Sequence, residues 1–248
     1  MQKINPCYSV ITVTYNAEQF LERTLQSVSE QDYTNIEYII VDGASKDNTL
    51  KLAAQYNNTI TKLVSEPDKG LYDAMNKAIQ LATGDYLCFL NAGDTFYSST
   101  ILSEVSNSIS KSNALPDVIY GQTAIVNNGG EFLRMRRLTA PVTLNWKSFK
   151  SGMLVCHQAF WPRRDLVDFY DLQYRYSSDF NWCIEILKRS KTNHNTKLTL
   201  INYLNEGLTT ENQYKSLSER FRIMAKHYGL PSTIARHIGF ILRHFLKR

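Results

Sequence analysis

The chain has 248 residues, a net charge of +5, 43% hydrophobic residues and four cysteines. This composition fits one large globular domain, or one domain with an appendage, and the mild positive charge does not by itself indicate a nucleic-acid partner. The cysteines lack CxxC spacing, which argues against a zinc site or a disulfide framework. No apolar run approaches the roughly 18 residues that span a membrane, and no secretory signal is recognisable, so we expect a cytosolic protein.

Residues 1–95 alternate between strand-forming and helix-forming segments. Apolar and β-branched runs predict strands at Tyr8–Thr14, 36–41, 60–64 and 86–90. Apolar residues at helical spacing predict helices at 18–30, 47–56 and Leu71–Leu81. This alternation is typical of a parallel sheet, so we expect an α/β fold with a mostly parallel sheet and helices on both faces.

The second half of the chain is less regular. Further helices are predicted at 98–111 and 177–187, a strand at 197–204, and an extended segment at 156–160. The Asn-Asn-Gly-Gly sequence at 127–130 predicts a hairpin between strands at Val118–Val126 and 131–137. Two final helices, 211–228 and 233–247, are separated by Gly229 and Pro231.

The last predicted helix is basic and amphipathic. Its apolar residues fall on one side, at Ile234, Ile238, Ile241, Leu242 and Phe245. Arginine, histidine and lysine fill the remaining positions. Two interpretations stay open: the helix packs on the domain and exposes a basic face, or it lies on an anionic membrane surface.

Polar residues follow three of the predicted strands. Tyr15 and Asn16 follow the first strand, Asp42 and Gly43 end the second, and the sequence Asn-Ala-Gly-Asp at 91–94 ends the fourth. Right-handed crossovers bring the carboxyl ends of parallel strands to one edge of a sheet. Ligands bind at that edge in open α/β sheets, so we expect a site there.

Several segments, in order and at matching spacing, resemble the family 2 glycosyltransferases with the GT-A fold. They are SVITVTYNAEQFLERTLQSVSEQ, EYIIVDGASKDNT, SEPDKGLYDAMNKAIQLATGDYLCFLNAGD, CHQAFW and SSDFNW. They span about two-thirds of the chain and are most similar to enzymes of bacterial capsule, O-antigen and exopolysaccharide synthesis. The resemblance implies a Rossmann-like GT-A domain over 1–210, with a nucleotide-binding half at 1–95 and an acceptor half at 96–210. Residues 211–248, which carry little of the resemblance, would form a helical extension for which packing on the domain and association with a membrane surface both stay open.

Sugar transfer requires a held nucleotide, a neutralised diphosphate and a base that removes the acceptor proton. The resemblance implies that Thr14, Tyr15 and Asn16 cradle the nucleobase. Asn91, at the end of the fourth strand, is assigned to the same nucleotide-binding set.

Asp42 ends a strand, where acidic residues of nucleotide-binding folds accept hydrogen bonds from base or ribose. The alternative is a turn or cap for the following helix, a role that suits Ser45 or Asp47 better. Asp68 and Lys69 lie in a predicted turn, which the resemblance places beside the nucleotide. Lys69 would then contact the base or a phosphate as a point charge.

Asp94 matches the last acidic position of the family's metal motif. Many members have two or three carboxylates in this motif, whereas here Asn91 stands where a second acid would be. The resemblance implies Mg²⁺ or Mn²⁺ at Asp94, bound weakly until donor phosphates and waters complete its ligands. The alternative role for Asp94 is a helix or turn cap.

An inverting transfer needs a base on the far side of the anomeric carbon from the diphosphate. Asp179, at the start of the predicted helix 177–187, matches the family's base position. An acidic residue is also favoured there by the helix dipole, which is the alternative explanation. The resemblance places His157 and Gln158 on the donor-sugar or acceptor side, and Glu206 near the acceptor mouth.

We therefore predict an inverting, metal-dependent glycosyltransferase. It would move a sugar from a nucleotide-diphosphate donor, most commonly UDP in this family, to a lipid-linked saccharide at the inner face of a bacterial plasma membrane. A nucleotidyltransferase of similar fold is disfavoured, because no Gly-rich basic loop follows the first strand. A non-catalytic nucleotide-binding assembly protein is disfavoured by the presence of both Asp94 and Asp179. No nucleic-acid partner is expected.

Overall fold

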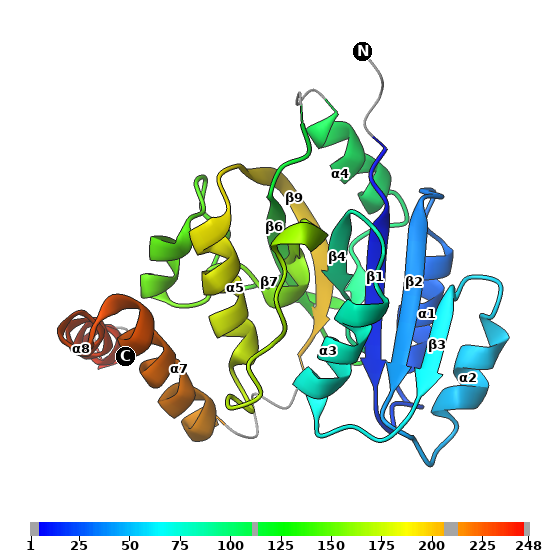
Figure 1. Cartoon of the computed structure of the whole chain (residues 1–248), viewed down its shortest axis with the longest axis horizontal. Helices are drawn as coiled ribbons and strands as arrows, with labels where there is room; N and C mark the ends of the chain where they lie inside the picture. Colours follow the sequence, from blue (N-terminus) through cyan, green and yellow to red (C-terminus); the bar gives the residue numbers. More distant parts are fainter. Residues whose placement is uncertain (1–4, 111–113, 206–212, 246–248) are drawn as a thin grey trace.

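The computed structural model describes residues 5–110, 114–205 and 213–245, and its strands lie side by side between helices (Figure 1). The first four strands are β1 (Tyr8–Thr14), β2 (Ile36–Asp42), β3 (Lys62–Ser65) and β4 (Tyr86–Phe89). All pair in parallel, in the order β3-β2-β1-β4. Every residue of β1 and β4 is buried, as expected for strands covered on both faces. The predicted parallel sheet is confirmed.

A second sheet continues this layer. It contains β5 (Thr95–Phe96), β9 (Asn193–Leu204), β6 (Val118–Val126) and β7 (Phe132–Met135), in that order, with β8 (Phe160–Pro162) also paired to β6. β6 and β9 are parallel, and the other pairs are antiparallel. An isolated bridge between Tyr86 and Arg163 joins the two sheets. The hairpin predicted around 127–130 is therefore present.

Helices cover both faces of the parallel sheet, as predicted. In Figure 1, α3 (Leu71–Leu81) lies in front of the strands and α1 (Leu21–Ser29) behind them. α1 buries Leu21, Leu25 and Val28, whose spacing places them on one side of the helix. α2 (Thr49–Gln55) follows β2, and α4 (Ile101–Ile109) precedes β6.

The C-terminal helices form one end of the molecule (Figure 1). α7 (Gln213–Tyr228) contacts α5 (Ser178–Arg189), and α8 (Leu230–Phe245) contacts α7. Gly229 joins them with φ +82°, a left-handed conformation that glycine adopts without strain. Pro231 was expected in the linker but lies in the first turn of α8. A proline is tolerated there because backbone N–H groups of the first turn have no partner within the helix.

Among the helices that the structure describes, none combines the length and the apolar character needed to cross a bilayer.

Two sequence-based predictions in the second half were wrong in detail. Residues 156–160, expected to be extended, contain a 3₁₀ turn, η2 (His157–Ala159), before β8 begins. The Nε1–H of Trp161 closes this turn by donating to the carbonyl of Gln158 at 2.7 Å. β9 begins at Asn193, ahead of the predicted 197–204, because its polar first residues pair with β6 rather than showing an apolar alternation.

A buried carboxylate holds the amino-terminal edge of the parallel sheet together. Glu37 of β2 accepts hydrogen bonds from Ser9 Oγ (2.6 Å), Lys62 Nζ (2.7 Å) and both Oγ1 and the backbone N–H of Thr83 (2.8 and 2.7 Å). Burial alone would raise the pKa of Glu37, but these hydrogen bonds outweigh it and lower the pKa to about 2.

The hydrogen bonds to Glu37 predict how the stability of the fold changes at acid pH. Because the folded pKa of about 2 lies below the ordinary glutamate value of 4.5, the network stabilises the fold above about pH 4.5 and is lost as the pH falls toward 2. Glu37→Gln should lower the free energy of unfolding at pH 7 by roughly 3 kcal/mol, and by less at pH 3, in urea titrations. Glu30→Gln, at an exposed position, is the matched control. An equal effect of Glu37→Gln at both pH values would contradict this account.

Candidate active site

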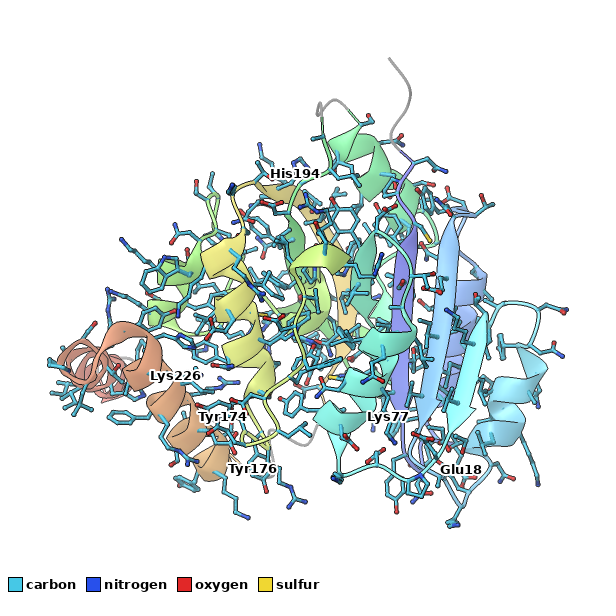
Figure 2. The ribbon with its side chains drawn as sticks, in the orientation of Figure 1. Glu18, Lys77, Tyr174, Tyr176, His194 and Lys226 are labelled. Atoms are coloured by element: carbon cyan, nitrogen blue, oxygen red, sulfur yellow. The ribbon has the colours of Figure 1, made fainter. Side chains whose placement is uncertain are left out.

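The strands β1, β2 and β4 end at one edge of the sheet, the lower edge in both figures. Thr14 and Asp42 pair there at the last register position of β1 and β2. Figure 2 labels Glu18 near this edge and His194 near the opposite one. The backbone N–H of Leu204, the last residue of β9, donates to Asp94 Oδ1 at 2.8 Å. The edge therefore continues into the second sheet, as the expected site requires.

Asp42 ties the ends of three strands together. Its carboxylate accepts hydrogen bonds from Thr14 Oγ1 (3.0 Å), Ser65 Oγ (2.7 Å) and the N–H (2.9 Å) and Oγ of Ser45. Burial raises the pKa of Asp42, but the bonds from Ser45, Ser65 and Thr14 outweigh it and leave the pKa below its ordinary value. The side chain is fully buried, so it shapes the loops around the edge.

The loops that follow β1, β2 and β3 meet at Gly43. A Cβ at this position would clash with Asp68 Oδ2 and lie 3.2 Å from the ring of Tyr15. Tyr15 is 65% exposed, so its ring forms part of the surface at this edge. Asn16 has φ +48°, and its Oδ1 accepts a 2.9 Å bond from Lys46 N–H, which fixes the turn. The structure thus brings together the residues predicted to hold the nucleobase.

Asp68 and Lys69 shape the turn before α3. Asp68 Oδ1 accepts from Gly70 N–H at 2.7 Å, and the backbone N–H of Lys69 donates to Asp73 Oδ2 at 2.9 Å. Gly70 has φ +117°, a conformation that few other residues adopt. Lys69 is exposed and follows Asp68, whose carboxylate lies against Gly43 of the loop after β2.

Asp94 is held in a buried position between the two sheets. Its Oδ1 accepts from Leu204 N–H, and its Oδ2 accepts from Gln158 Nε2 at 2.7 Å. Thr24 of α1 fixes the preceding turn, since its Oγ1 donates to the Asp94 carbonyl at 2.8 Å and accepts from Gly93 N–H at 2.9 Å. Burial raises the pKa of Asp94 to about 7 despite these two donors to its carboxylate.

The residues around Asp94 can coordinate a hard divalent cation only if a bound phosphate supplies further oxygen atoms. Across the described residues, no cluster of three or more histidine, cysteine, aspartate or glutamate side chains gathers as a metal site. Asn91 Oδ1, however, is a buried oxygen that has no hydrogen-bond partner within the described part of the chain. A carboxylate and an amide oxygen are donors that Mg²⁺ and Mn²⁺ accept, and phosphate oxygens commonly complete such sites.

Asp179 stands in the first turn of α5. Its Oδ1 accepts a 3.0 Å hydrogen bond from the hydroxyl of Tyr72, which comes from α3. Tyr72 is buried, so this bond fixes the carboxylate at one point. The side chain of Asp179 is half-buried and remains accessible at the rim of the site.

His157 lies in a buried aromatic cluster. Its ring stacks on Phe89 (5.0 Å between centroids), meets Trp182 at 5.7 Å, and hydrogen-bonds the hydroxyl of Tyr170. Tyr170 in turn stacks on Tyr72 at 5.3 Å. Burial lowers the pKa of His157 to about 4, although the charge of Asp179 opposes this shift. His157 is therefore neutral near pH 7 and a weak base, which leaves Asp179 as the better candidate for that role.

The η2 turn links the two halves of the site. Of its two consecutive residues, Gln158 binds Asp94, and His157 reaches Asp179 through the tyrosines of the aromatic cluster. Burial is the main cause that raises the pKa of Tyr203, and the charges of Asp94 and Asp179 add to it. Glu206 lies outside the described residues.

One carboxylate that no sequence motif marks supports the site from a distance. Glu219 of α7 accepts hydrogen bonds from the backbone N–H groups of Arg175, Tyr176 and Ser177 at 2.9, 2.8 and 2.9 Å. These residues lead directly into α5, and Figure 2 labels Tyr176 in this segment. Ser177 occupies the N-cap position without capping through its side chain; its hydroxyl bonds Ser216 instead. The sequence held one signal: Glu219 is the only acidic residue from 213 to 248.

The chain belongs to glycosyl transferase family 2, whose sequence model matches residues 9–170. It is 33% identical over 189 residues to a PGL/p-HBAD biosynthesis glycosyltransferase of Mycobacterium bovis, covering 72% of this chain and 69% of that protein. It is 25% identical over 222 residues to WfgD of Escherichia coli, covering 87% and 84%. WfgD is named as a UDP-Glc:alpha-D-GlcNAc-diphosphoundecaprenol beta-1,3-glucosyltransferase.

Solved structures share the fold. The crystal structure of Staphylococcus aureus TarS residues 1–349 superposes with a TM-score of 0.71 at 17% identity, covering 94% of this chain and 72% of that one. This likeness confirms the predicted GT-A fold, and the family match confirms that the chain is a glycosyltransferase.

The Glu219 contacts predict a local effect on α5. Glu219→Gln should speed hydrogen exchange at the amides of 175–177 and lower the free energy of unfolding by about 1–3 kcal/mol, because three N–H groups lose a charged acceptor. Glu185→Gln, at a partly exposed position on α5, is the control. Unchanged exchange at 175–177 would show that Glu219 does not fix the start of α5.

Proposed function

We propose that the chain is an inverting glycosyltransferase that moves a sugar from a UDP-sugar to a lipid-linked saccharide in bacterial surface polysaccharide synthesis. The observation that supports it most is the pairing of Asp94 and Asp179 around the η2 turn. One carboxylate is buried at the nucleotide edge, and the other is accessible and fixed by Tyr72. A buried carboxylate and an accessible one, held by different elements, suit a reaction in which the diphosphate leaves from one side and the acceptor attacks from the other.

The comparisons support the choice of donor and acceptor. TarS structures contain UDP and UDP-GlcNAc, and the name of WfgD specifies UDP-glucose and an undecaprenyl-diphosphate-linked sugar. Thr14, Tyr15, Asn16, Asp68 and Lys69 are proposed to contact the nucleotide. Asp42 would act chiefly by holding these loops, because its carboxylate is buried and already bonded.

Asp179 is proposed as the general base. Its Oδ1 is bound by Tyr72, so we assign Oδ2 to the acceptor proton. As the acceptor hydroxyl loses this proton, its oxygen forms the new bond to the anomeric carbon. The bond from that carbon to the diphosphate oxygen breaks on the opposite face, and the nucleoside diphosphate leaves with the electron pair. The anomeric configuration is thereby inverted.

A divalent cation, Mg²⁺ or Mn²⁺, would be held by Asp94 with Asn91 Oδ1 as a second oxygen, and it would neutralise charge on the leaving diphosphate. Gln158 and the Leu204 N–H orient the Asp94 carboxylate from behind. A positive charge at this point would favour the ionised form of Asp94, whose pKa burial otherwise raises to about 7.

The base assignment is tested by Asp179→Asn. The amide keeps the size of the side chain but takes no proton, so transfer should fall by about 10²–10⁴-fold while UDP affinity stays near wild type. Asp168→Asn, on an exposed aspartate that pairs with Arg189, is the control. The measurement is UDP release with a panel of donors. Wild-type turnover in Asp179→Asn would exclude it as the base.

The metal assignment is tested by calorimetry with UDP. We expect Mn²⁺ to strengthen UDP binding, and Asp94→Asn to remove most of this increment while metal-free binding persists. Glu66→Gln, at an exposed glutamate that pairs with Lys77, is the control. If Mn²⁺ has no effect on the wild type, the metal is not part of donor binding. If UDP does not bind at all, a non-catalytic role is favoured.

A further inference from the structure

α8 uses an unexpected side to pack against the protein. Thr233 is fully buried, and the ring of His237 lies 5.0 Å from Phe221 of α7 and 5.6 Å from Phe240. Thr233, His237 and Phe240 follow one another at helical spacing, so they define the inner face of α8. This face is not the isoleucine face that the sequence pattern suggested for packing.

The isoleucine face of α8 is turned outward. Leu230, Ile234 and Ile238 are 53%, 44% and 52% exposed. Their spacing of four residues makes them a continuous apolar row along the helix, which we call the α8 stripe. Single exposed apolar residues are ordinary on protein surfaces, but a row of large aliphatic side chains along one helix indicates an interaction surface.

The sequence of the helix pair that carries the α8 stripe is rich in basic residues. Residues 213–248 carry eight lysines and arginines against the single acid Glu219, whereas acidic residues slightly outnumber basic ones in the rest of the chain. Glu219 is itself buried and bonded to the backbone before α5, so it adds little to the surface. Lys215, Lys226 and Arg236 are exposed on this helix pair. Figure 2 shows Lys226 on α7, at the end of the molecule that α7 and α8 form.

We propose that α7 and α8 form a docking surface for an anionic phospholipid bilayer. The α8 stripe would enter the interfacial region, and the surrounding lysines and arginines would pair with lipid phosphates, each cation contributing about 1 kcal/mol near the surface. An exposed aliphatic row on a helix pair with an excess of basic residues matches this partner in both polarity and charge. An acidic protein would satisfy the charges alone, and a second copy of this chain would bring like charges together.

The bonds between α7 and α5 give this surface a role in the reaction, and only this step rests on the proposed function. Glu219 and Ser216 of α7 bind the residues that lead into α5, where Asp179 lies. Docking of the helix pair would therefore set the orientation of the acceptor side of the site relative to the membrane. A lipid-linked acceptor would then be presented to Asp179 from the bilayer surface.

The test is vesicle sedimentation of the full chain, which needs no turnover and so stands apart from any failure of the proposed reaction. We expect binding to vesicles of equal parts phosphatidylcholine and phosphatidylglycerol, weak binding to phosphatidylcholine alone, and loss of binding as salt is raised. The double variant Ile234→Ser/Ile238→Ser should reduce the vesicle partition constant at least tenfold. The physical reason is that two aliphatic side chains would no longer be transferred from water into the bilayer interface.

Two matched controls separate the α8 stripe from general surface effects. Val142→Ser removes an apolar side chain that is 86% exposed elsewhere, and it should leave vesicle binding unchanged. Lys226→Gln, at an exposed lysine four residues before Leu230 of the α8 stripe, should weaken binding about fivefold, whereas Lys51→Gln on α2 should not. Equal binding of the double variant and the wild type would overturn the proposal. So would a wild-type dimer in sedimentation velocity that the double variant abolishes, because the stripe would then be a self-association surface.

Discussion

The carboxylate of Asp94 is buried at the junction of the two sheets, and the arrangement of the site depends on satisfying it there. A carboxylate removed from water is costly unless donors or a cation compensate it. Gln158 and the Leu204 N–H supply two donors, and in doing so they join η2 and the end of β9 to the edge proposed to bind the nucleotide. Burial still raises the pKa of Asp94 to about 7. A nearby cation would favour the ionised carboxylate, so this position suits a residue that binds a cation together with the nucleotide-sugar.

A second constraint fixes the other half of the site from the C-terminal helices. Glu219 of α7 accepts hydrogen bonds from three backbone N–H groups in the segment that leads into α5. Asp179 stands one turn further on, bound by Tyr72 of α3. The proposed base is therefore positioned by two elements that are distant from it in sequence. This dependence links α7 to the site, although the sequence analysis treated residues 211–248 as an extension.

The outer face of α8 completes this picture at the level of the whole molecule. The inner face of the helix uses a threonine, a histidine and a phenylalanine, whereas the more apolar Leu230, Ile234 and Ile238 are exposed. This arrangement leaves apolar surface exposed to water in the free protein, which is unfavourable. The exposure is explained if a partner covers that surface. Together with the basic residues of the helix pair, this surface is proposed to dock on a bilayer. Docking would place the site next to a lipid-linked acceptor.

The sequence by itself determined the parallel sheet and the gathering of Tyr15, Asp42 and Asp94 at one edge, because strand periodicity and right-handed crossovers are local rules. It also indicated the family through motifs whose order and spacing are linear information. Only the tertiary structure decided that His157 is buried and neutral, that Gln158 turns toward Asp94, and that Glu219 fixes the start of α5. The face on which α8 packs was likewise undetermined, because helical periodicity identifies an apolar side but not what covers it. The contacts that build the site join residues as far apart as Asp94 and Leu204, 110 positions along the chain, and no local pattern can encode such a contact.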